Sequence, residues 1–243
     1  MLHSQPRLDL REQRIPGFEA LLRWQHPRLG LLMPNDFMPL LEMSEAIHGL
    51  TSQVLVLAVT EQQRWHATHQ KLAVSVNLSP RNLVDDRCMR FLDELIETRG
   101  LPSGALELEI TETTLMHDPE GARVLLSGIA ARGVALSIDD FGTGHSSLAY
   151  LRRLPIRALK IDRTFVRDMR SDEHDRIIVR STINLAHNLG LQVVAEGAED
   201  LDTPALLRGM GCDQAPGYAI APPMPREEID DWLASWSDPC ASE

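Results

Sequence analysis

Six carboxylate residues and one asparagine lie in or just beyond apolar segments of this sequence, most of them at the carboxyl end of a segment. The set is Glu19, Asn77, Glu109, Asp139, Asp140, Asp162 and Glu196. If these ends meet at one edge of the fold, so many like charges cannot all stay ionised unless their pKa values rise or cations neutralise them. Carboxylate and amide oxygens are the ligands that hard cations such as Mg2+ and Mn2+ prefer. The pattern therefore predicts a divalent metal site.

Two of these residues, Asp139 and Asp140, are adjacent in the chain, so one carboxylate could bridge two ions. Two cations about 3.5–4 Å apart are a common arrangement in enzymes that cleave phosphodiesters. Helix capping or a surface position would explain one acidic residue of this kind. Six at corresponding positions favour a catalytic interpretation.

The elements that must position these residues alternate between strands and helices. Several apolar segments have the composition of strands buried on both faces of a parallel sheet. We predict strands at Arg7–Leu10, Gly17–Leu22, Leu72–Asn77, Leu106–Ile110, Val134–Ile138, Ile156–Ile161, Leu191–Ala195 and Asp213–Ile220. We predict helices at Pro34–Leu41, Leu50–His66, Arg87–Thr98, Pro119–Ala131, His174–Asn188, Pro204–Gly209 and Arg226–Trp236.

This alternation predicts an α/β fold, a (β/α)8 TIM-type barrel whose functional side chains collect at the carboxyl ends of the strands. One junction departs from the pattern, because only Arg11–Pro16 separates the first two strands. A parallel crossover needs about a dozen residues or more. The barrel is therefore expected to be modified, with an antiparallel first strand and no helix at Arg11–Pro16.

Composition limits the class of protein. The 243 residues include 35 Asp and Glu against 24 Lys and Arg, a net charge of −11, which argues against binding a nucleic-acid polymer. The apolar content and the length suit one globular domain over residues 1–243. The first residues have no apolar signal segment, and the three cysteines form no closely spaced pair. A cytoplasmic location is expected.

Linked motifs in this chain resemble the EAL family of cyclic di-GMP phosphodiesterase domains. The motifs are GFEALLRWQHP, VNLSPRNL, LELEITET, SIDDFGTGHSSL, LKIDR and VVAEGAED, in the order and at the spacing typical of the family. The resemblance covers nearly the whole chain. It implies the modified barrel that the short Arg11–Pro16 junction also predicts.

The resemblance further implies metal-dependent hydrolysis of cyclic di-GMP to linear pGpG by a two-metal mechanism, in bacterial second-messenger signalling. Two ions, Mg2+ or Mn2+, are expected, with Asp139 in the bridging position. Carried over by position, the metal ligands are Glu19, Asn77, Glu109, Asp139 and Asp140.

The remaining motif positions imply roles in catalysis and in binding the substrate. Lys160 matches the lysine near the attacking water, Glu196 matches the surroundings of the second metal, and Glu112 matches the residue that steadies the loop Asp139–Ser147. An arginine at position 23 can form paired hydrogen bonds to phosphate oxygens. The positions expected to face the ligand are Leu21, Arg23, Asp162 and Glu199.

Three departures from the family pattern keep an alternative open, in which the domain is a cyclic di-GMP receptor that does not hydrolyse its ligand. Pro216 replaces a common glutamine before Gly217-Tyr218, and Pro222 replaces a common basic residue. The chain also opens at His3-Ser4-Gln5-Pro6 without the usual preceding helix. It is therefore expected to be a fragment of a longer protein with upstream sensory or regulatory domains, and the resemblance suggests a homodimer.

Overall fold

The computed structural model describes residues 1–68, 71–83, 86–143, 148–198, 200, 202–216 and 220–236. Eight strands form a closed barrel: β1 (Leu2–Asp9), β2 (Gly17–Leu22), β5 (Ala73–Asn77), β6 (Leu106–Thr111), β7 (Ala135–Phe141), β8 (Ala158–Ile161), β9 (Gln192–Ala195) and β10 (Gln214–Pro216). The barrel closes where β10 pairs with β1. The predicted fold class is confirmed.

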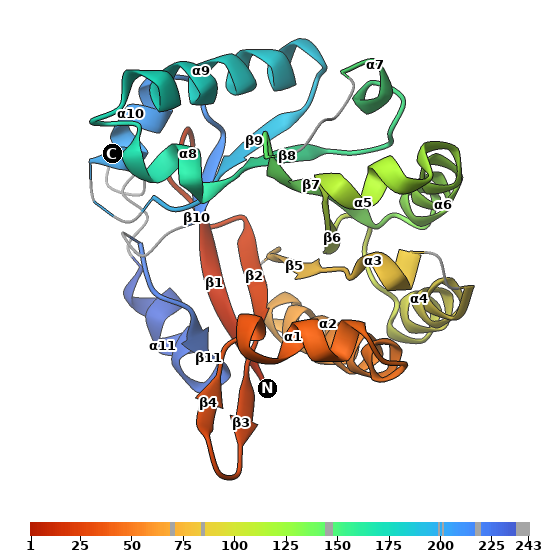
Figure 1. The fold of residues 1–243 in the computed structure, drawn as a ribbon. Coiled ribbons are helices and arrows are strands. Elements are labelled where there is room, and N and C mark those ends of the chain that lie inside the picture. The colour runs from red at the N-terminus through yellow and green to blue at the C-terminus, as the bar shows by residue number, and fades with distance from the viewer. Residues whose placement is uncertain are drawn as a thin grey trace.

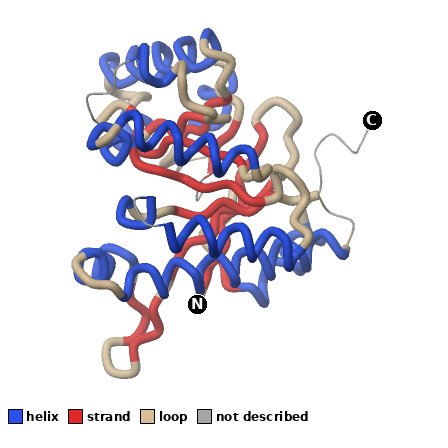
Figure 2. The backbone as a smooth tube through the Cα atoms, turned by 90° about the vertical axis from the view of Figure 1, so that its right-hand side faces the viewer, coloured by secondary structure: helices blue, strands red, loops and turns tan. Residues whose placement is uncertain are grey.

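Helices surround the barrel strands, as Figure 1 and the turned view of Figure 2 show. The longer ones are α1 (Pro34–Glu42), α2 (Ala46–Ala67), α4 (Asp86–Arg99), α6 (Pro119–Ala131), α9 (Glu173–Asn188) and α11 (Arg226–Ser235). Shorter ones lie in the connections: α3 (Pro80–Leu83), α5 (Glu112–His117), α7 (Leu148–Leu151), α8 (Arg163–Asp168) and α10 (Thr203–Gly209). Among the described residues no helix is both long and apolar enough to cross a bilayer.

The first strand is antiparallel to both of its neighbours in the barrel, β2 and β10. The turn after β1 is held by the Asp9 carboxylate, which accepts hydrogen bonds from the backbone N–H groups of Arg11 (3.0 Å) and Glu12 (2.8 Å). Gln13 has a φ of 54°, in the left-handed region that tight turns use. The prediction of a hairpin without a helix at Arg11–Pro16 is confirmed.

Several strand predictions differ from the structure at their ends, and the first strand, β7 and the last barrel strand are examples. The strand predicted at Val134–Ile138 is β7, Ala135–Phe141, and so includes Asp139 and Asp140. The first strand begins at Leu2, five residues before the predicted Arg7. Its early residues, which include His3, Ser4 and Gln5, lack an apolar pattern, and their strand conformation comes from pairing with β2 and with β11 (Met224–Pro225). The described part of the last barrel strand is Gln214–Pro216, and residues 217–219 of the predicted strand lie outside the described residues.

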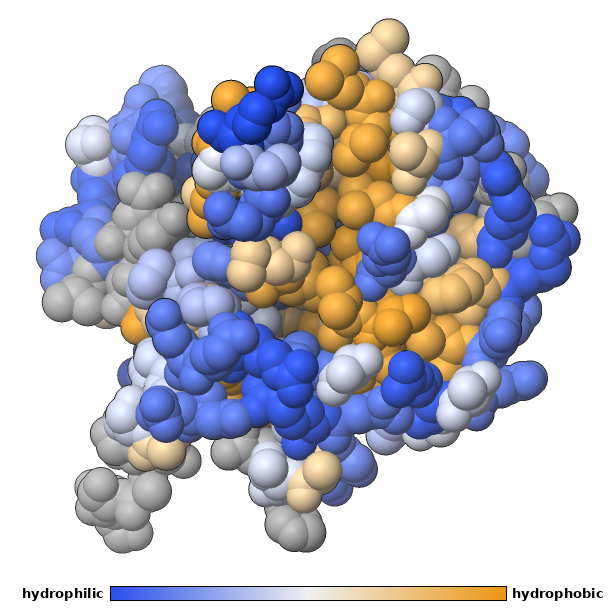
Figure 3. All heavy atoms as spheres, turned by 90° about the horizontal axis from the view of Figure 1, so that it is seen from below, coloured by the Kyte–Doolittle hydropathy of each residue, from blue (hydrophilic) through white to orange (hydrophobic). Residues whose placement is uncertain are grey.

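A short hairpin was missing from the sequence prediction. Its strands are β3 (Trp24–His26) and β4 (Gly30–Leu32), and Gly30 adopts a φ of 77°. Trp24, Leu29 and Leu31 are exposed apolar residues of this hairpin. Figure 3, which views the molecule from below, shows hydrophobic residues near the centre of that face and hydrophilic residues around much of its border.

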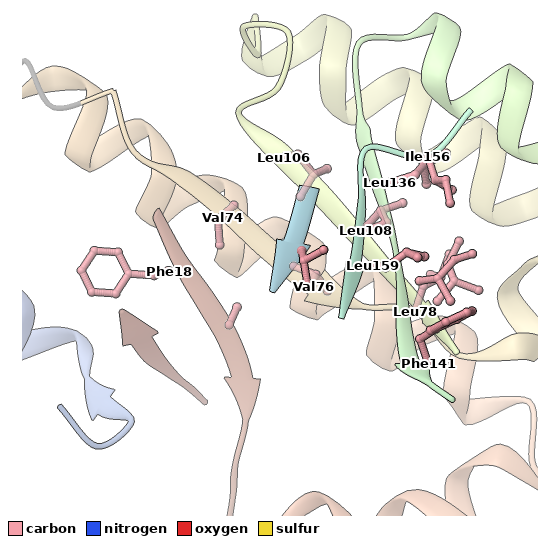
Figure 4. Close-up of a cluster of buried hydrophobic side chains, with 14 of the residues drawn as sticks. Phe18, Val74, Val76, Leu78, Leu106, Leu108, Leu136, Phe141, Ile156 and Leu159 are labelled. Carbon is pink, nitrogen blue, oxygen red and sulfur yellow. The ribbon is translucent and has the colours of Figure 1, made fainter. Parts of the chain in front are cut away.

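The hydrophobic core lies between the barrel and the helices (Figure 4). The side chain of Phe18 on β2 points out of the barrel toward the helices. The centroid of its ring lies 4.8 Å from that of Trp65 on α2 and 6.0 Å from that of Trp232 on α11. Successive residues of a strand point to opposite faces, so Glu19 points into the barrel. Many TIM barrels fill this interior with branched apolar residues, whereas here it receives charged side chains.

Candidate active site

The centre of the acidic cluster is Lys160, a fully buried residue of β8. Its Nζ donates a hydrogen bond to Oε2 of Glu109 and lies 2.7 Å from Oε1 of Glu196. The same nitrogen is 3.4 Å from Oδ2 of Asp139 and 3.6 Å from Oε2 of Glu19. The structure thus brings together four carboxylates, three on barrel strands and one just after β9, around a single ammonium group.

The two adjacent aspartates face the same site because β7 is irregular at this point. A regular strand would place neighbouring side chains on opposite faces. Here the register between β7 and β8 shifts between Ile138 and Phe141, and Asp140 has a φ of 54°. One oxygen each of Asp139, Asp140 and Glu196 lie within 4.8 Å of one another, an arrangement that could hold a metal ion.

Asn77, at the end of β5, completes the predicted ligand set. Its Nδ2 donates a 3.1 Å hydrogen bond to Oε1 of Glu19, so the amide lies beside the first carboxylate of the cluster. The residue is exposed, whereas Glu19 and Glu109 are buried. The amide therefore lies at the open end of the barrel.

The electrostatics of the cluster show an excess of negative charge. Burial and the nearby Glu109 raise the pKa of Glu19 to about 8, and burial raises the pKa of Glu196 to about 7 despite Lys160. Burial alone would lower the pKa of Lys160, but the carboxylates, Glu109 foremost, hold it well above its ordinary value. Oε1 of Glu109 is buried without a hydrogen-bond partner. One ammonium group does not satisfy this cluster, and the oxygen-only donor set fits divalent cations.

Asp162 and Glu112 accept hydrogen bonds from nearby backbone N–H groups. Asp162 precedes α8 and accepts a 2.8 Å hydrogen bond from the backbone N–H of Thr164. Burial would raise the pKa of Asp162, yet hydrogen bonds from Thr164 help to hold it below its ordinary value. The pKa of the neighbouring Asp140 is raised to about 6, mainly by burial. Glu112 is buried, and its Oε2 accepts a 3.0 Å hydrogen bond from the backbone N–H of Gly142. This bond ties the segment after β7 to α5, although residues 144–147 of that loop lie outside the described residues.

The structure describes the surroundings of two further residues that are predicted to face the ligand, Leu21 and Arg23. Leu21 is half-buried on β2, on the same face of the strand as Glu19. Arg23 is buried and its Nη1 donates a 2.8 Å hydrogen bond to the carbonyl oxygen of Leu22. Glu199 lies outside the described residues. Their contact with a substrate stays a prediction.

An ion pair that the sequence analysis missed lies deeper in the barrel. Nη1 of Arg7 on β1 lies 2.9 Å from Oε2 of Glu107 on β6, and both side chains are buried. Burial would raise the pKa of Glu107, yet Arg7 holds it below its ordinary value. The alternation of β6 was the available signal, because Glu107 is two residues before Glu109 and must share its inward face.

Comparison with known proteins decides the family. The family model of the EAL domain matches residues 1–223. The chain belongs to the EAL family. This EAL domain is 41% identical over 236 residues to the cyclic di-GMP phosphodiesterase NbdA of Pseudomonas aeruginosa, covering 97% of this chain and 30% of that protein.

Solved structures agree with this relationship. A structure described as PaMucR phosphodiesterase in a c-di-GMP complex superposes with a TM-score of 0.91 at 37% identity, covering 94% of this chain and 93% of that one. The EAL domain of Mycobacterium smegmatis DcpA gives a TM-score of 0.83 at 36% identity, covering 97% of each chain. The chain spans only 30–39% of the length of three curated relatives that it matches.

Proposed function

We propose that this EAL domain hydrolyses cyclic di-GMP to linear pGpG with the help of two divalent cations, Mg2+ or Mn2+. The observation that carries the proposal is the convergence of Glu19, Glu109, Asp139 and Glu196 on Lys160, with Asn77 beside Glu19. Relatives such as NbdA are named cyclic di-GMP phosphodiesterases, which supports the substrate.

The proposed metal ligands are Glu19, Asn77, Glu109, Asp139 and Asp140. Bound cations would supply a water of lowered pKa and would stabilise negative charge on the phosphoryl group. The two raised carboxyl pKa values close to Lys160, those of Glu19 and Glu196, fit this role, because cations would replace the protons that the cluster otherwise retains.

The chain's own groups then orient the reaction. Lys160 contacts Glu109 and Glu196 and so fixes two carboxylates. We expect its positive charge to help stabilise the negative charge that develops on the phosphoryl group. Glu112 holds the backbone at Gly142, which places the segment that follows Asp139 and Asp140. Arg23 and Asp162 would contact the substrate near the rim, together with Leu21 and Glu199.

The alternative function, binding of cyclic di-GMP without hydrolysis, draws on Pro216. This residue is buried in β10 and replaces a glutamine that is common in the family. Proline supplies neither a side-chain hydrogen bond nor a backbone N–H. If the glutamine orders water or substrate, its absence lowers turnover while the carboxylates remain in place.

Incubation of the purified chain with cyclic di-GMP and Mg2+ or Mn2+, followed by chromatography, tests the proposal. We expect linear pGpG that disappears with EDTA and in Asp139→Asn, whereas the exposed control Asp231→Asn on α11 retains native activity. Saturable binding of intact cyclic di-GMP without product would establish the receptor function. Product formation that is insensitive to EDTA would contradict the metal-dependent mechanism.

We also propose an oligomeric state, a location and further domains for the full-length protein. We infer from the relatives' greater length that sensory or regulatory domains accompany this domain in its full-length protein. A homodimer in the cytoplasm is the expected state. Sedimentation of the purified chain over a range of concentrations tests the dimer.

A further inference from the structure

A second polar site lies inside the barrel, among residues that the acidic cluster does not use. It is a cavity of about 190 Å³. Its charged and amide lining residues are Arg7, Arg14, Lys71, Glu107, Arg157, Gln192 and Gln214. None of them belongs to the proposed metal or substrate sites.

The cavity opens at the amino-terminal end of the barrel. Ala73, Ala158, Gln192 and Gln214 line it, and each is the first residue of its strand. The acidic cluster lies at the carboxyl ends of the same parallel strands, so the two sites are at opposite ends of the barrel. The small side chains of Ala73 and Ala158 leave the space that the cavity occupies.

Arg7 provides the deepest binding group of the cavity. The residue is 3% exposed, and one of its nitrogens, Nη1, is hydrogen-bonded to Glu107. Its Nε is buried without a hydrogen-bond partner, as is Oε1 of Gln214. A buried donor without an acceptor is costly, and a small rotation of the Arg7 side chain toward the cavity would let an oxygen of a bound ligand satisfy it. The Gln214 amide can rotate to offer its NH2 group to the same ligand.

The charge of the lining favours an anion. Four lining residues are basic and one is acidic, in a chain with a net charge of −11. Arg14 is paired outside the cavity with Glu12, and Nε of Arg157 donates a 3.3 Å hydrogen bond to Gln192. Arg157 and Lys71 are exposed, so their charged groups can reach a ligand at the mouth. Arginine presents a planar set of donors that matches phosphate oxygens.

We propose that this cavity binds a small anion through a phosphate group, with Arg7 at its base and Lys71 and Arg157 at its mouth. The volume is below the range of roughly 300–1,000 Å³ typical of pockets for larger ligands. It therefore suits inorganic phosphate or the phosphate of a small phosphomonoester. The site is independent of the proposed phosphodiesterase activity, and its test does not use that activity.

The test is isothermal titration calorimetry on protein freed of divalent metal, in a chloride buffer without other oxyanions. Without metal the opposite end of the barrel is acidic and repels phosphate, so binding there does not interfere. One arm titrates inorganic phosphate and the second titrates ribose 5-phosphate. Tighter binding of ribose 5-phosphate identifies the site as one for phosphomonoesters, and equal or weaker binding identifies inorganic phosphate as the ligand.

Two exposed positions supply variants that leave the buried pair Arg7–Glu107 intact. Arg157→Gln and Lys71→Gln should each weaken phosphate binding by about tenfold, the loss expected for one charged hydrogen bond. Arg11→Gln is the matched control, an exposed arginine in the turn after β1 that does not line the cavity. We expect it to bind within about twofold of the native protein. Thermal unfolding verifies that all three variants are folded.

Absence of saturable phosphate binding to the native chain would overturn the proposal. An equal loss of affinity in Arg11→Gln and Arg157→Gln would also overturn it, because the effect would then come from surface charge rather than from the cavity.

Discussion

Buried negative charge is neutralised at the amino-terminal end of the barrel and left in excess at the carboxyl end. Glu107 and Glu109 are two residues apart on the inward face of β6. Glu107 is paired with Arg7, which holds its pKa below the ordinary value. Glu109 lies among carboxylates that one lysine does not neutralise, and Oε1 of its own carboxylate has no partner. One strand thus supplies both a neutral ion pair that supports the fold and part of an excess of negative charge that suits cations.

Substitution at the carboxyl end should have the largest effect on function. We expect Asp139→Asn to lower turnover of cyclic di-GMP by about a thousandfold, because it removes the proposed bridging carboxylate. The same variant should be at least as stable as the native protein without metal, since one repelling charge is gone. Initial rates of pGpG formation and urea unfolding measure the two effects. Native turnover in Asp139→Asn would contradict its role.

Substitution at the amino-terminal end should lower the stability of the protein. Glu107→Gln leaves Arg7 buried without its counter-charge, and we expect it to lower the free energy of unfolding by about 3 kcal/mol. Glu97→Gln on the exposed surface of α4 is the matched control and should change stability little. Urea unfolding of the metal-free proteins measures the difference. Equal stability of the two variants would mean that the buried pair does not support the fold.

A substitution at Glu112 tests whether its hydrogen bond to the backbone of Gly142 helps to position the acidic residues of β7. Glu112→Gln weakens the acceptor for the Gly142 backbone N–H, and we expect turnover to fall by about tenfold to a hundredfold. The affinity for Mn2+ should change less than turnover, because Glu112 is not a proposed ligand. Turnover and a Mn2+ titration on the same sample separate the effects. A loss of metal affinity as large as the loss of turnover would make Glu112 part of the metal site itself.

The pH dependence of stability gives the smallest expected effect. Glu19 has a pKa of about 8 when folded, against an ordinary value of 4.5, so the folded protein retains a proton that the unfolded chain releases. The stabilisation is therefore complete below about pH 4.5 and is lost as the pH rises through 8. We expect the metal-free protein to lose about 1 kcal/mol or more between pH 5 and 8.

Saturating Mg2+ should reverse this trend, because the cation binds the ionised carboxylates. Glu19→Gln should reduce the trend without metal, since the variant has no proton to lose at this position, while Glu196 and Asp140 still titrate. Unfolding free energies across the pH range, with and without Mg2+, provide the measurement. Stability of the metal-free protein that rises between pH 5 and 8 would contradict the raised pKa of Glu19.

The sequence predicted most of the barrel because its strands have a strong apolar pattern and its acidic residues lie at strand ends. The start of β1 could not be predicted, because His3, Ser4 and Gln5 do not belong to an apolar segment. Asp139 and Asp140 face the same site because β7 is irregular, and the residue types of this segment do not predict that irregularity. The pairing of Arg7 with Glu107 required the register across the barrel, since the two residues are 100 positions apart.

A Mn2+ titration of the native chain and of Asp139→Asn and Glu107→Gln, at a pH above 8, tests whether the acidic end of the barrel is the metal site. We predict saturable binding of two ions by the native protein, loss of that binding in Asp139→Asn, and native binding in folded Glu107→Gln. Failure of the native protein to bind Mn2+, or identical binding by native protein and Asp139→Asn, would contradict the assignment of the acidic end as the metal site.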